Sequence, residues 1–169
     1  MSPSMLQARV FDALVLDRDA VLAGQLWRLW SGHWMHLDLR HAAINLVALV
    51  LMTLIAARMR QLRPLLVASL SMMPLTAAGL LLAIPDLQWY AGLSGLLHGG
   101  AAWLLLRRGG RVAAIGALLL AGKLVWEHWA PAAEASAFPV IHAAHLAGAL
   151  VGAALALPVA RRARHRPAH

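Results

Sequence analysis

The chain has 169 residues, of which 61% are hydrophobic and only 13% are charged. That length suits a single domain, and the apolar content is too high and too clustered for a soluble core. The absence of cysteine excludes disulfides and thiolate chemistry. A net charge of +8 would fit nucleic acid, but a basic nucleic-acid face requires charges gathered on one soluble surface, and these are not.

The basic residues are placed as in a membrane protein. Ten arginines form three clusters with no acidic residue among them, and the seven acidic residues all lie elsewhere. The clusters come after the first, third and fifth apolar runs, which is the positive-inside pattern of a polytopic membrane protein. They are Arg58/Arg60/Arg63, Arg107/Arg108/Arg111 and Arg161/Arg162/Arg164/Arg166.

The N-terminal part is predicted to lie outside the bilayer. Residues 1–23 are the least hydrophobic, and Met5–Leu16 is too short to span about 30 Å of hydrocarbon. It also lacks the basic start and apolar core of a signal peptide, so residues 1–23 are interpreted as a surface helix or arm. Residues 24–40 are rich in tryptophan at helical spacing, which favours the lipid–water boundary. These tryptophans are Trp27, Trp30 and Trp34.

Five apolar runs follow and predict an all-α, polytopic membrane helix bundle within residues 24–160. The third run is short for a span, which fits a helix that starts below the membrane surface. Pro74 predicts a kink in the second run. Residues 161–169 form a basic cytoplasmic tail, which puts the N-terminal region on the outer side. The runs are His41–Ala57, Pro64–Ile84, Ala91–Leu106, Val112–Trp129 and Val140–Ala160, with a loop at Ala130–Pro139.

A serine and a histidine lie in two of these runs, a few residues inside their outer ends. Polar groups in a span are costly, which makes Ser94 and His145 candidates for a nucleophile and its base. Serine is also a common small residue at helix contacts, and a packed, hydrogen-bonded histidine is the alternative for His145. Glycines adjoin both residues and predict that their helices pack closely. They are Gly92, Gly95 and Gly99 on one run and Gly148 and Gly152 on the other.

His41 and Asn45 lie at a similar depth at the start of the first run. They are four residues apart and project from one helical face. Two side-chain donors facing a serine would stabilise an oxyanion, and an interhelical hydrogen bond is the alternative.

Taken in order, these patterns resemble the signatures of the rhomboid intramembrane serine proteases, over about residues 24–160. The resemblance implies a six-span bundle, with about five spans in this chain and the first missing or partly replaced by residues 5–23. It implies a Ser94–His145 dyad acting on transmembrane protein substrates in the bilayer, without metal or cofactor. The motifs are His36…His41…Asn45, Gly92-Leu93-Ser94-Gly95 and Ala144-His145-Leu146-Ala147-Gly148-Ala149-Leu150-Val151-Gly152.

The same resemblance distributes the remaining roles. The oxyanion is held by the backbone N–H of Ser94 with His41 and Asn45. No acidic residue is near His145 in sequence, so packing is expected to orient its imidazole. Supporting roles near the serine fall to His36, Gly92, Gly95, His98 and Gly148.

Further details are similar to the rhombosortase branch. These are the small size, His98 four residues after the serine, and Lys123 and Glu127 in the penultimate run, which are interpreted as a structural pair. That branch is associated with secreted proteins that carry a C-terminal Gly-Gly, transmembrane-helix and basic-tail sorting signal. The resemblance implies a bacterial inner membrane protein whose active site faces the periplasm.

Two alternatives stay open. A histidine-rich metal-binding membrane protein is one, because there are nine histidines, of which His41, His98 and His145 are the candidate ligands. The absence of His-Glu-x-x-His argues against it. The other is a non-catalytic rhomboid relative that binds transmembrane helices, against which the presence of both Ser94 and His145 argues.

Overall fold

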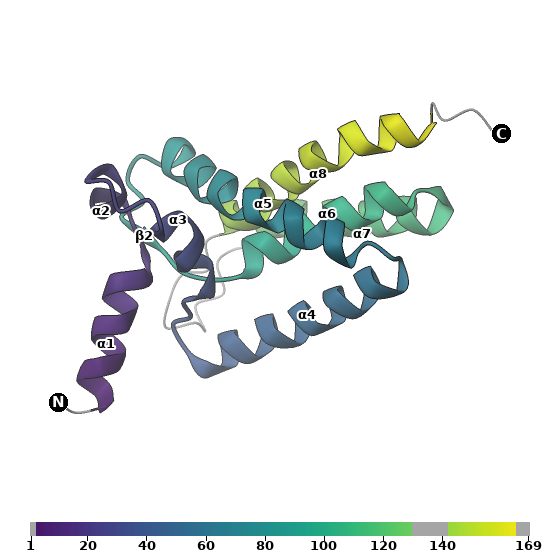
Figure 1. Ribbon diagram of the computed structural model, residues 1–169. Helices are drawn as coiled ribbons and strands as arrows, with labels where there is room; N and C mark the ends of the chain where they lie inside the picture. Colours follow the sequence, from purple (N-terminus) through teal and green to yellow (C-terminus); the bar gives the residue numbers. More distant parts are fainter. Residues whose placement is uncertain (1–2, 130–141, 165–169) are drawn as a thin grey trace.

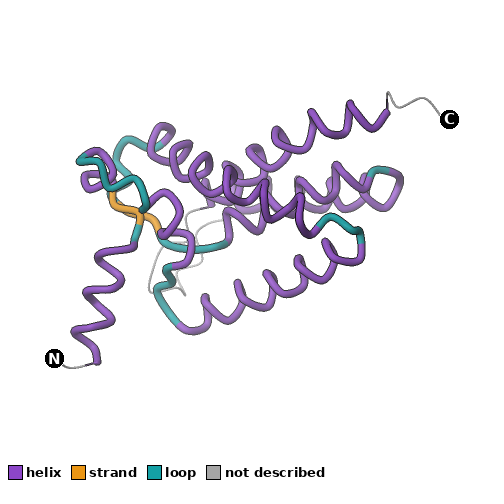
Figure 2. The backbone as a smooth tube through the Cα atoms, viewed as in Figure 1, coloured by secondary structure: helices purple, strands orange, loops and turns teal. Residues whose placement is uncertain are grey.

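A computed structural model describes residues 3–129 and 142–164, which are almost entirely helical (Figures 1 and 2). The predicted loop at 130–139, the start of the fifth run at 140–141 and the end of the tail at 165–169 lie outside the described residues. The elements are α1 (Pro3–Leu14), β1 (Leu16–Asp17), α2 (Arg18–Leu22), α3 (Arg28–Ser31), η1 (Gly32–Trp34), α4 (Leu39–Arg58), α5 (Leu62–Ala83), β2 (Trp89–Tyr90), α6 (Ser94–Arg108), α7 (Gly110–Trp129) and α8 (His142–Arg164).

Three of the described helices, α4, α5 and α7, are long and apolar enough to cross a membrane. The prediction of a helical membrane bundle is therefore confirmed, although fewer helices than the predicted five meet this criterion within residues 3–129 and 142–164. α6 has 15 residues, which at 1.5 Å per residue is about 22 Å and shorter than a bilayer core. α8 covers the fifth run, with an apolar stretch at His142–Leu157.

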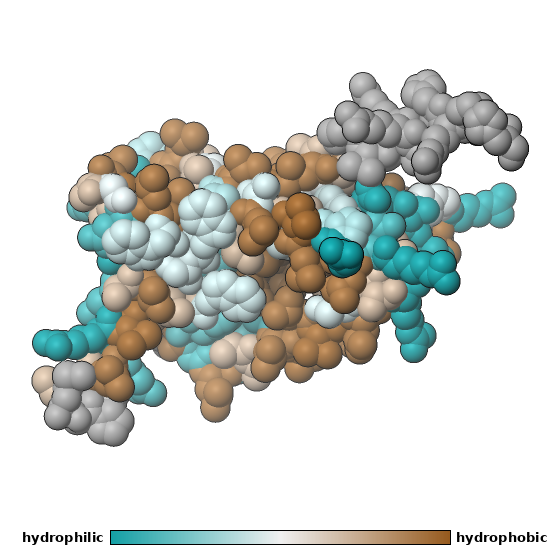
Figure 3. Space-filling view, viewed as in Figure 1, coloured by the Kyte–Doolittle hydropathy of each residue, from teal (hydrophilic) through white to brown (hydrophobic). Residues whose placement is uncertain are grey.

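The outer helices expose apolar side chains that water would not tolerate in such numbers. On α4, Leu46 and Val47 are each 60% exposed, and on α7 Leu118 is 72% exposed. Hydrophobic surface covers much of the face shown in Figure 3. An uncovered patch of this size marks contact with lipid or a partner, and helices satisfy all their backbone polar groups in hydrocarbon. These surfaces indicate an integral membrane protein.

α6 lies at the centre of the bundle and packs against α4, α5, α7 and α8. Its Leu96, Trp103 and Leu104 join buried residues of α5 such as Met72 in one hydrophobic core. Its contact with α8 is backbone to backbone, because Gly148 faces the carbonyl of Gly95 and Gly152 faces the carbonyl of Gly99. The small residues predicted to bring two helices together therefore do so between α6 and α8.

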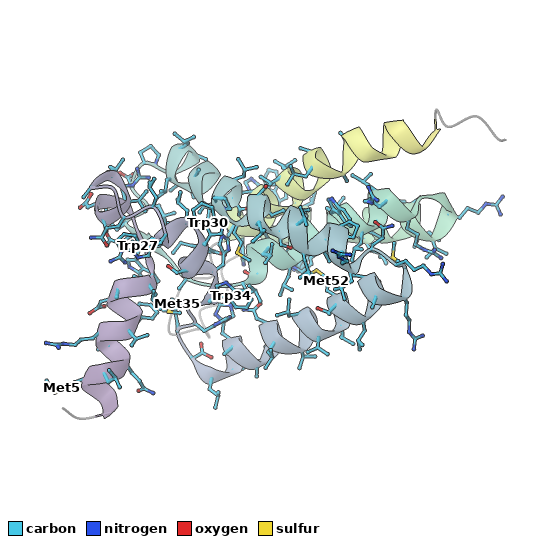
Figure 4. All side chains as sticks on the ribbon, viewed as in Figure 1. Met5, Trp27, Trp30, Trp34, Met35 and Met52 are labelled. Carbon is cyan, nitrogen blue, oxygen red and sulfur yellow. The ribbon has the colours of Figure 1, made fainter. Side chains whose placement is uncertain are left out.

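Helix α5 continues through Pro74 because a tryptophan from residues 24–40 supplies the hydrogen bond that the proline removes. A proline has no N–H, so the carbonyl of Leu70, four residues earlier, loses its helical donor. The indole N–H of Trp30 donates to that carbonyl at 2.9 Å. Trp27 directly precedes α3, Trp30 lies on α3 and Trp34 on η1. They are 54%, 40% and 50% exposed, as expected for rings at a lipid–water boundary (Figure 4).

The basic turns lie at one end of the bundle. The guanidinium of Arg107, near the end of α6, donates to Gln61 Oε1 at 2.8 Å, which joins it to the α4–α5 turn. Figure 1 shows the α4–α5 and α6–α7 turns at the right, and the N-terminal elements with β2 at the left. The first two arginine clusters therefore share an end opposite to the start of α6.

Residues 15–22 secure the loop that precedes α6, while α1 points away from the bundle (Figure 1). β1 pairs antiparallel with β2, with Leu16 opposite Tyr90. The guanidinium of Arg18 donates to the carbonyls of Leu81, Ile84 and Leu87 at 2.6–2.8 Å. The three carbonyls lie in the last turn of α5 and in the loop after it, so Arg18 ties this loop to the end of the helix.

Replacing Arg18 with alanine is expected to lower the free energy of unfolding by about 2–3 kcal/mol, because hydrogen bonds from a charged group contribute about 1.5–3 kcal/mol each and are not additive. Arg18→Lys should recover part of this, since one ammonium cannot reproduce the planar fork. Thermal unfolding in detergent measures both variants. The exposed Arg63 supplies the control, Arg63→Ala, and an equal effect there would contradict the assignment.

Candidate active site

Ser94 is the first residue of α6. The sequence predicted that this helix would begin about one turn earlier. The predicted run begins at Ala91, but Gly92 has a φ of +138°, which a helix cannot accommodate. The N–H of Gly92 donates to the Gly32 carbonyl at 3.1 Å and fixes this turn. The N–H groups of the first helical residues have no acceptor within the helix, and the helix dipole makes this end positive. An anionic oxygen beside Ser94 would therefore be stabilised.

Tyr90 lies directly against the serine. Its hydroxyl donates to the Gly92 carbonyl at 2.6 Å, and the ring is 3% exposed. Burial raises the pKa of Tyr90 to about 12, while interactions with the Gly95 backbone and the Ser94 side chain act in the opposite direction. The phenol is therefore neutral at physiological pH and adjoins the Ser94 hydroxyl. Tyr90 is not among the residues singled out from the sequence, although its position just before the Gly-x-Ser-Gly motif could have drawn attention to it.

His33 supports Tyr90 from η1. The two rings meet edge to face, with centroids 5.6 Å apart, and His33 Nε2 donates to the Met73 carbonyl of α5 at 2.9 Å. Burial lowers the pKa of His33, and the Met73 hydrogen bond acts against this shift. A neutral imidazole therefore holds the serine loop against α5.

His145 lies in the first turn and a half of α8, on the face that packs against α6. A Cβ atom on Gly95 would be 3.0 Å from the Ala144 carbonyl, so the residues next to Ser94 and His145 are in contact. His145 is 6% exposed. The structure thus brings together the two helix segments predicted to carry the nucleophile and the base.

His98 contacts both segments. Its Nδ1 lies 2.7 Å from the Ser94 carbonyl, one turn earlier in α6. Its ring stacks on that of His145, with centroids 4.2 Å apart and planes 13° apart. Within residues 3–129 and 142–164, no hydrogen bond joins the Ser94 side chain to His145 itself. His98 is the residue that connects them.

α7 supplies a charged pair to the same place. Lys123 Nζ lies 2.9 Å from His98 Nε2 and forms an ion pair with Glu127. The other carboxylate oxygen of Glu127 lies 2.9 Å from His145 Nδ1. The expectation that packing alone orients His145 is therefore wrong, because a carboxylate from another helix contacts its ring. The ion pair predicted between Lys123 and Glu127 exists, and both members also contact histidines.

His41 adjoins the serine loop from α4. A Cβ on Gly92 would be 3.2 Å from His41 Cε1, a tight contact in addition to the φ that already favours glycine at this position. The ring of His36 meets that of His41 at 5.2 Å. Asn45, one turn further along α4, is buried, and its Nδ2 has no hydrogen-bond partner among the residues that the structure describes. α4 thus contributes an uncommitted donor and an imidazole beside Gly92, the side chains that an oxyanion site would use.

The cluster also contains metal-ligand types. Ligand atoms of His98, Glu127 and His145 lie within 4.8 Å of one another. This differs from the trio considered from sequence, since His41 lies against Gly92 and not in this group. The ammonium of Lys123 contacts both His98 Nε2 and Glu127, so a metal ion would have to displace it.

Comparison with known proteins identifies the fold. No curated protein sequence matches the chain. The rhomboid domain model matches residues 23–162, which include α3 to α7 and nearly all of α8. The matched range contains Ser94, His41 on α4, His145 on α8 and the Lys123–Glu127 pair of α7. The chain therefore belongs to the rhomboid family.

Proposed function

We propose that the protein is an intramembrane serine endopeptidase in which Ser94 is the nucleophile and His145 the general base. Most of the rhomboid family are serine proteases. The observation that carries the proposal is the position of Ser94 at the positive end of α6, next to Gly95, whose backbone contacts the turn of α8 that bears His145. A helix-packing serine would not need free N–H groups beside it, whereas a nucleophile uses them.

In the proposed reaction, Ser94 Oγ turns from Tyr90 towards α8 and attacks a peptide carbonyl. His145 accepts the hydroxyl proton and then donates it to the leaving amine, which gives an acyl-enzyme and a free amine. Water attacks the acyl carbon and restores Ser94. The N–H of Ser94, with His41 and Asn45, holds the oxyanion in both steps. A loose hydrogen bond between nucleophile and base is common without substrate.

We assign the substrates to membrane-anchored proteins that carry a C-terminal Gly-Gly, transmembrane-helix and basic-tail signal. This assignment rests on the resemblance to the rhombosortase branch, and the contacts of His98 with Lys123 and of Lys123 with Glu127 support it, since they join the residues that carry that resemblance. Glycines next to the cleaved bond have no side chains, so they would not block the approach of Ser94 Oγ from the start of α6.

The same proposal orients the chain in a bacterial inner membrane. The turns that carry Arg58/Arg60/Arg63 and Arg107/Arg108/Arg111 share one end of the bundle, which the positive-inside rule assigns to the cytoplasm. Ser94 begins α6 at the other end. The active site then faces the periplasm, and the C-terminus is cytoplasmic.

A fluorophosphonate probe tests the nucleophile directly. It should label the purified protein at Ser94, identified by mass spectrometry of the modified peptide, because only an activated serine reacts at a useful rate. Co-expression with a Gly-Gly-tailed protein should produce a new C-terminus near the Gly-Gly pair. A chain that retains such substrates without labelling or cleavage would instead be a non-catalytic, helix-binding relative.

A further inference from the structure

We propose that Glu127 is the positioning residue for His145, so that the site is a Ser94–His145–Glu127 triad stabilised by Lys123. This inference rests on the proposed function and adds to it, because a dyad leaves the imidazole to be oriented by packing. It begins from a chain of hydrogen bonds that starts at the Ser94 carbonyl and ends at the His145 ring.

The protons of this chain can be assigned from one end to the other. The Ser94 carbonyl only accepts, so His98 Nδ1 carries a proton and donates at 2.7 Å. His98 Nε2 is then the lone-pair nitrogen and accepts from the Lys123 ammonium at 2.9 Å. Both nitrogens of His98 are committed, so His98 cannot take the serine proton without losing one of these bonds.

The second half of this series of hydrogen bonds, from Lys123 to His145, leaves His145 free to act as a base. Lys123 binds one oxygen of Glu127, and the other oxygen accepts from His145 Nδ1 at 2.9 Å. A carboxylate can only accept, so Nδ1 bears the proton and Nε2 keeps its lone pair. Among the described residues, His145 Nε2 has no hydrogen-bond partner, which distinguishes it from both nitrogens of His98.

The exposure of the side chains in this series of hydrogen bonds fits this division of roles. The side chains of His145, Glu127 and Lys123 are 8%, 16% and 48% exposed, so the imidazole and the carboxylate that contact each other are the most buried members of the series. A carboxylate beside a buried imidazole stabilises the imidazolium that forms when the serine proton is taken up. Lys123 holds that carboxylate in place, and the stack of His98 on His145 restricts the ring. A mere structural ion pair would not need the second oxygen of Glu127 to contact His145.

Glu127→Gln tests the role, because it keeps the size of the side chain and removes its charge. We expect kcat for a Gly-Gly-tailed substrate to fall by about 10²–10⁴-fold, with KM nearly unchanged, since Glu127 acts through His145 and does not touch substrate. Glu127→Asp should recover part of the loss. The ¹⁵N shifts of the His145 ring in detergent should show the Nδ1–H tautomer in the wild-type protein.

The matched control is His128→Gln, which alters an ionisable residue next in sequence whose ring contacts Trp129. It should retain wild-type kcat. If the wild type cleaves but Glu127→Gln stays within threefold of it, or if wild-type His145 carries its proton on Nε2, the triad is refuted and the dyad stands. If the wild-type protein neither reacts with the fluorophosphonate probe nor cleaves the substrate, the proposed protease function itself is refuted, whatever the role of Glu127. If thermal unfolding shows that the unfolded fraction of Glu127→Gln at the assay temperature accounts for its whole loss of kcat, a positioning role is also rejected.

Discussion

Ser94→Ala is expected to abolish cleavage of a membrane-anchored substrate, and His145→Ala is expected to do the same. Without Oγ there is no acyl-enzyme, and without the imidazole no group accepts its proton. Removing a nucleophile or its base costs about 10⁴–10⁶-fold in kcat in serine hydrolases. The two losses should not add, because the residues act as a unit. Gel-based detection of the product and the fluorophosphonate label give two independent measurements.

Two comparisons keep this result interpretable. Ser71 is an exposed serine of α5, and Ser71→Ala should cleave at the wild-type rate. Asn45→Ala removes only an oxyanion donor and should lose about 10²–10³-fold, which leaves detectable cleavage. Equal melting temperatures of Ser94→Ala and wild type would exclude misfolding. Wild-type cleavage by Ser94→Ala would refute the nucleophile.

The chemistry of this site is more visible in the sequence than its geometry. A hydroxyl and an imidazole in apolar runs stand out, since hydrocarbon tolerates polar groups only where they serve a purpose. Glycine spacing predicts that two helices approach closely, and α6 and α8 do. Glu127 was identified in a span, yet its partner lies 18 residues away on another helix. A periodic pattern gives the face of each helix but not the neighbour that this face meets.

The fold around the serine shows the same division. Apolar runs predict the long helices α4, α5 and α7 within a few residues. They do not reveal that α6 starts at Ser94, because the turn depends on the φ of Gly92 and on its hydrogen bond to Gly32. They also do not reveal that Arg18 secures the loop before the serine, since its acceptors are backbone carbonyls on α5 and the loop after it. Carbonyls are present at every residue and give no sequence signal.

Gly148→Ala is expected to destabilise the protein and to reduce cleavage at least about 10²-fold, through displacement of His145 from Ser94. A Cβ at this position would overlap the Gly95 carbonyl, and two helix backbones cannot yield as a flexible side chain does. The helices must separate, and a shift of about 1 Å at a catalytic group typically costs about 10²-fold.

The contrasting variant is Gly122→Ala on α7. A Cβ there meets nothing within 4 Å. In an open helical position, alanine in place of glycine gains up to about 1 kcal/mol of helix propensity, so the melting temperature of Gly122→Ala should hold or rise. The same substitution is therefore predicted to act in opposite directions on two helices of one bundle, because only α8 meets α6 through its backbone. If Gly148→Ala retained the melting temperature and cleavage of Gly122→Ala, α8 would not pack on α6 at this distance. The proximity of His145 to Ser94 would then lose its physical basis.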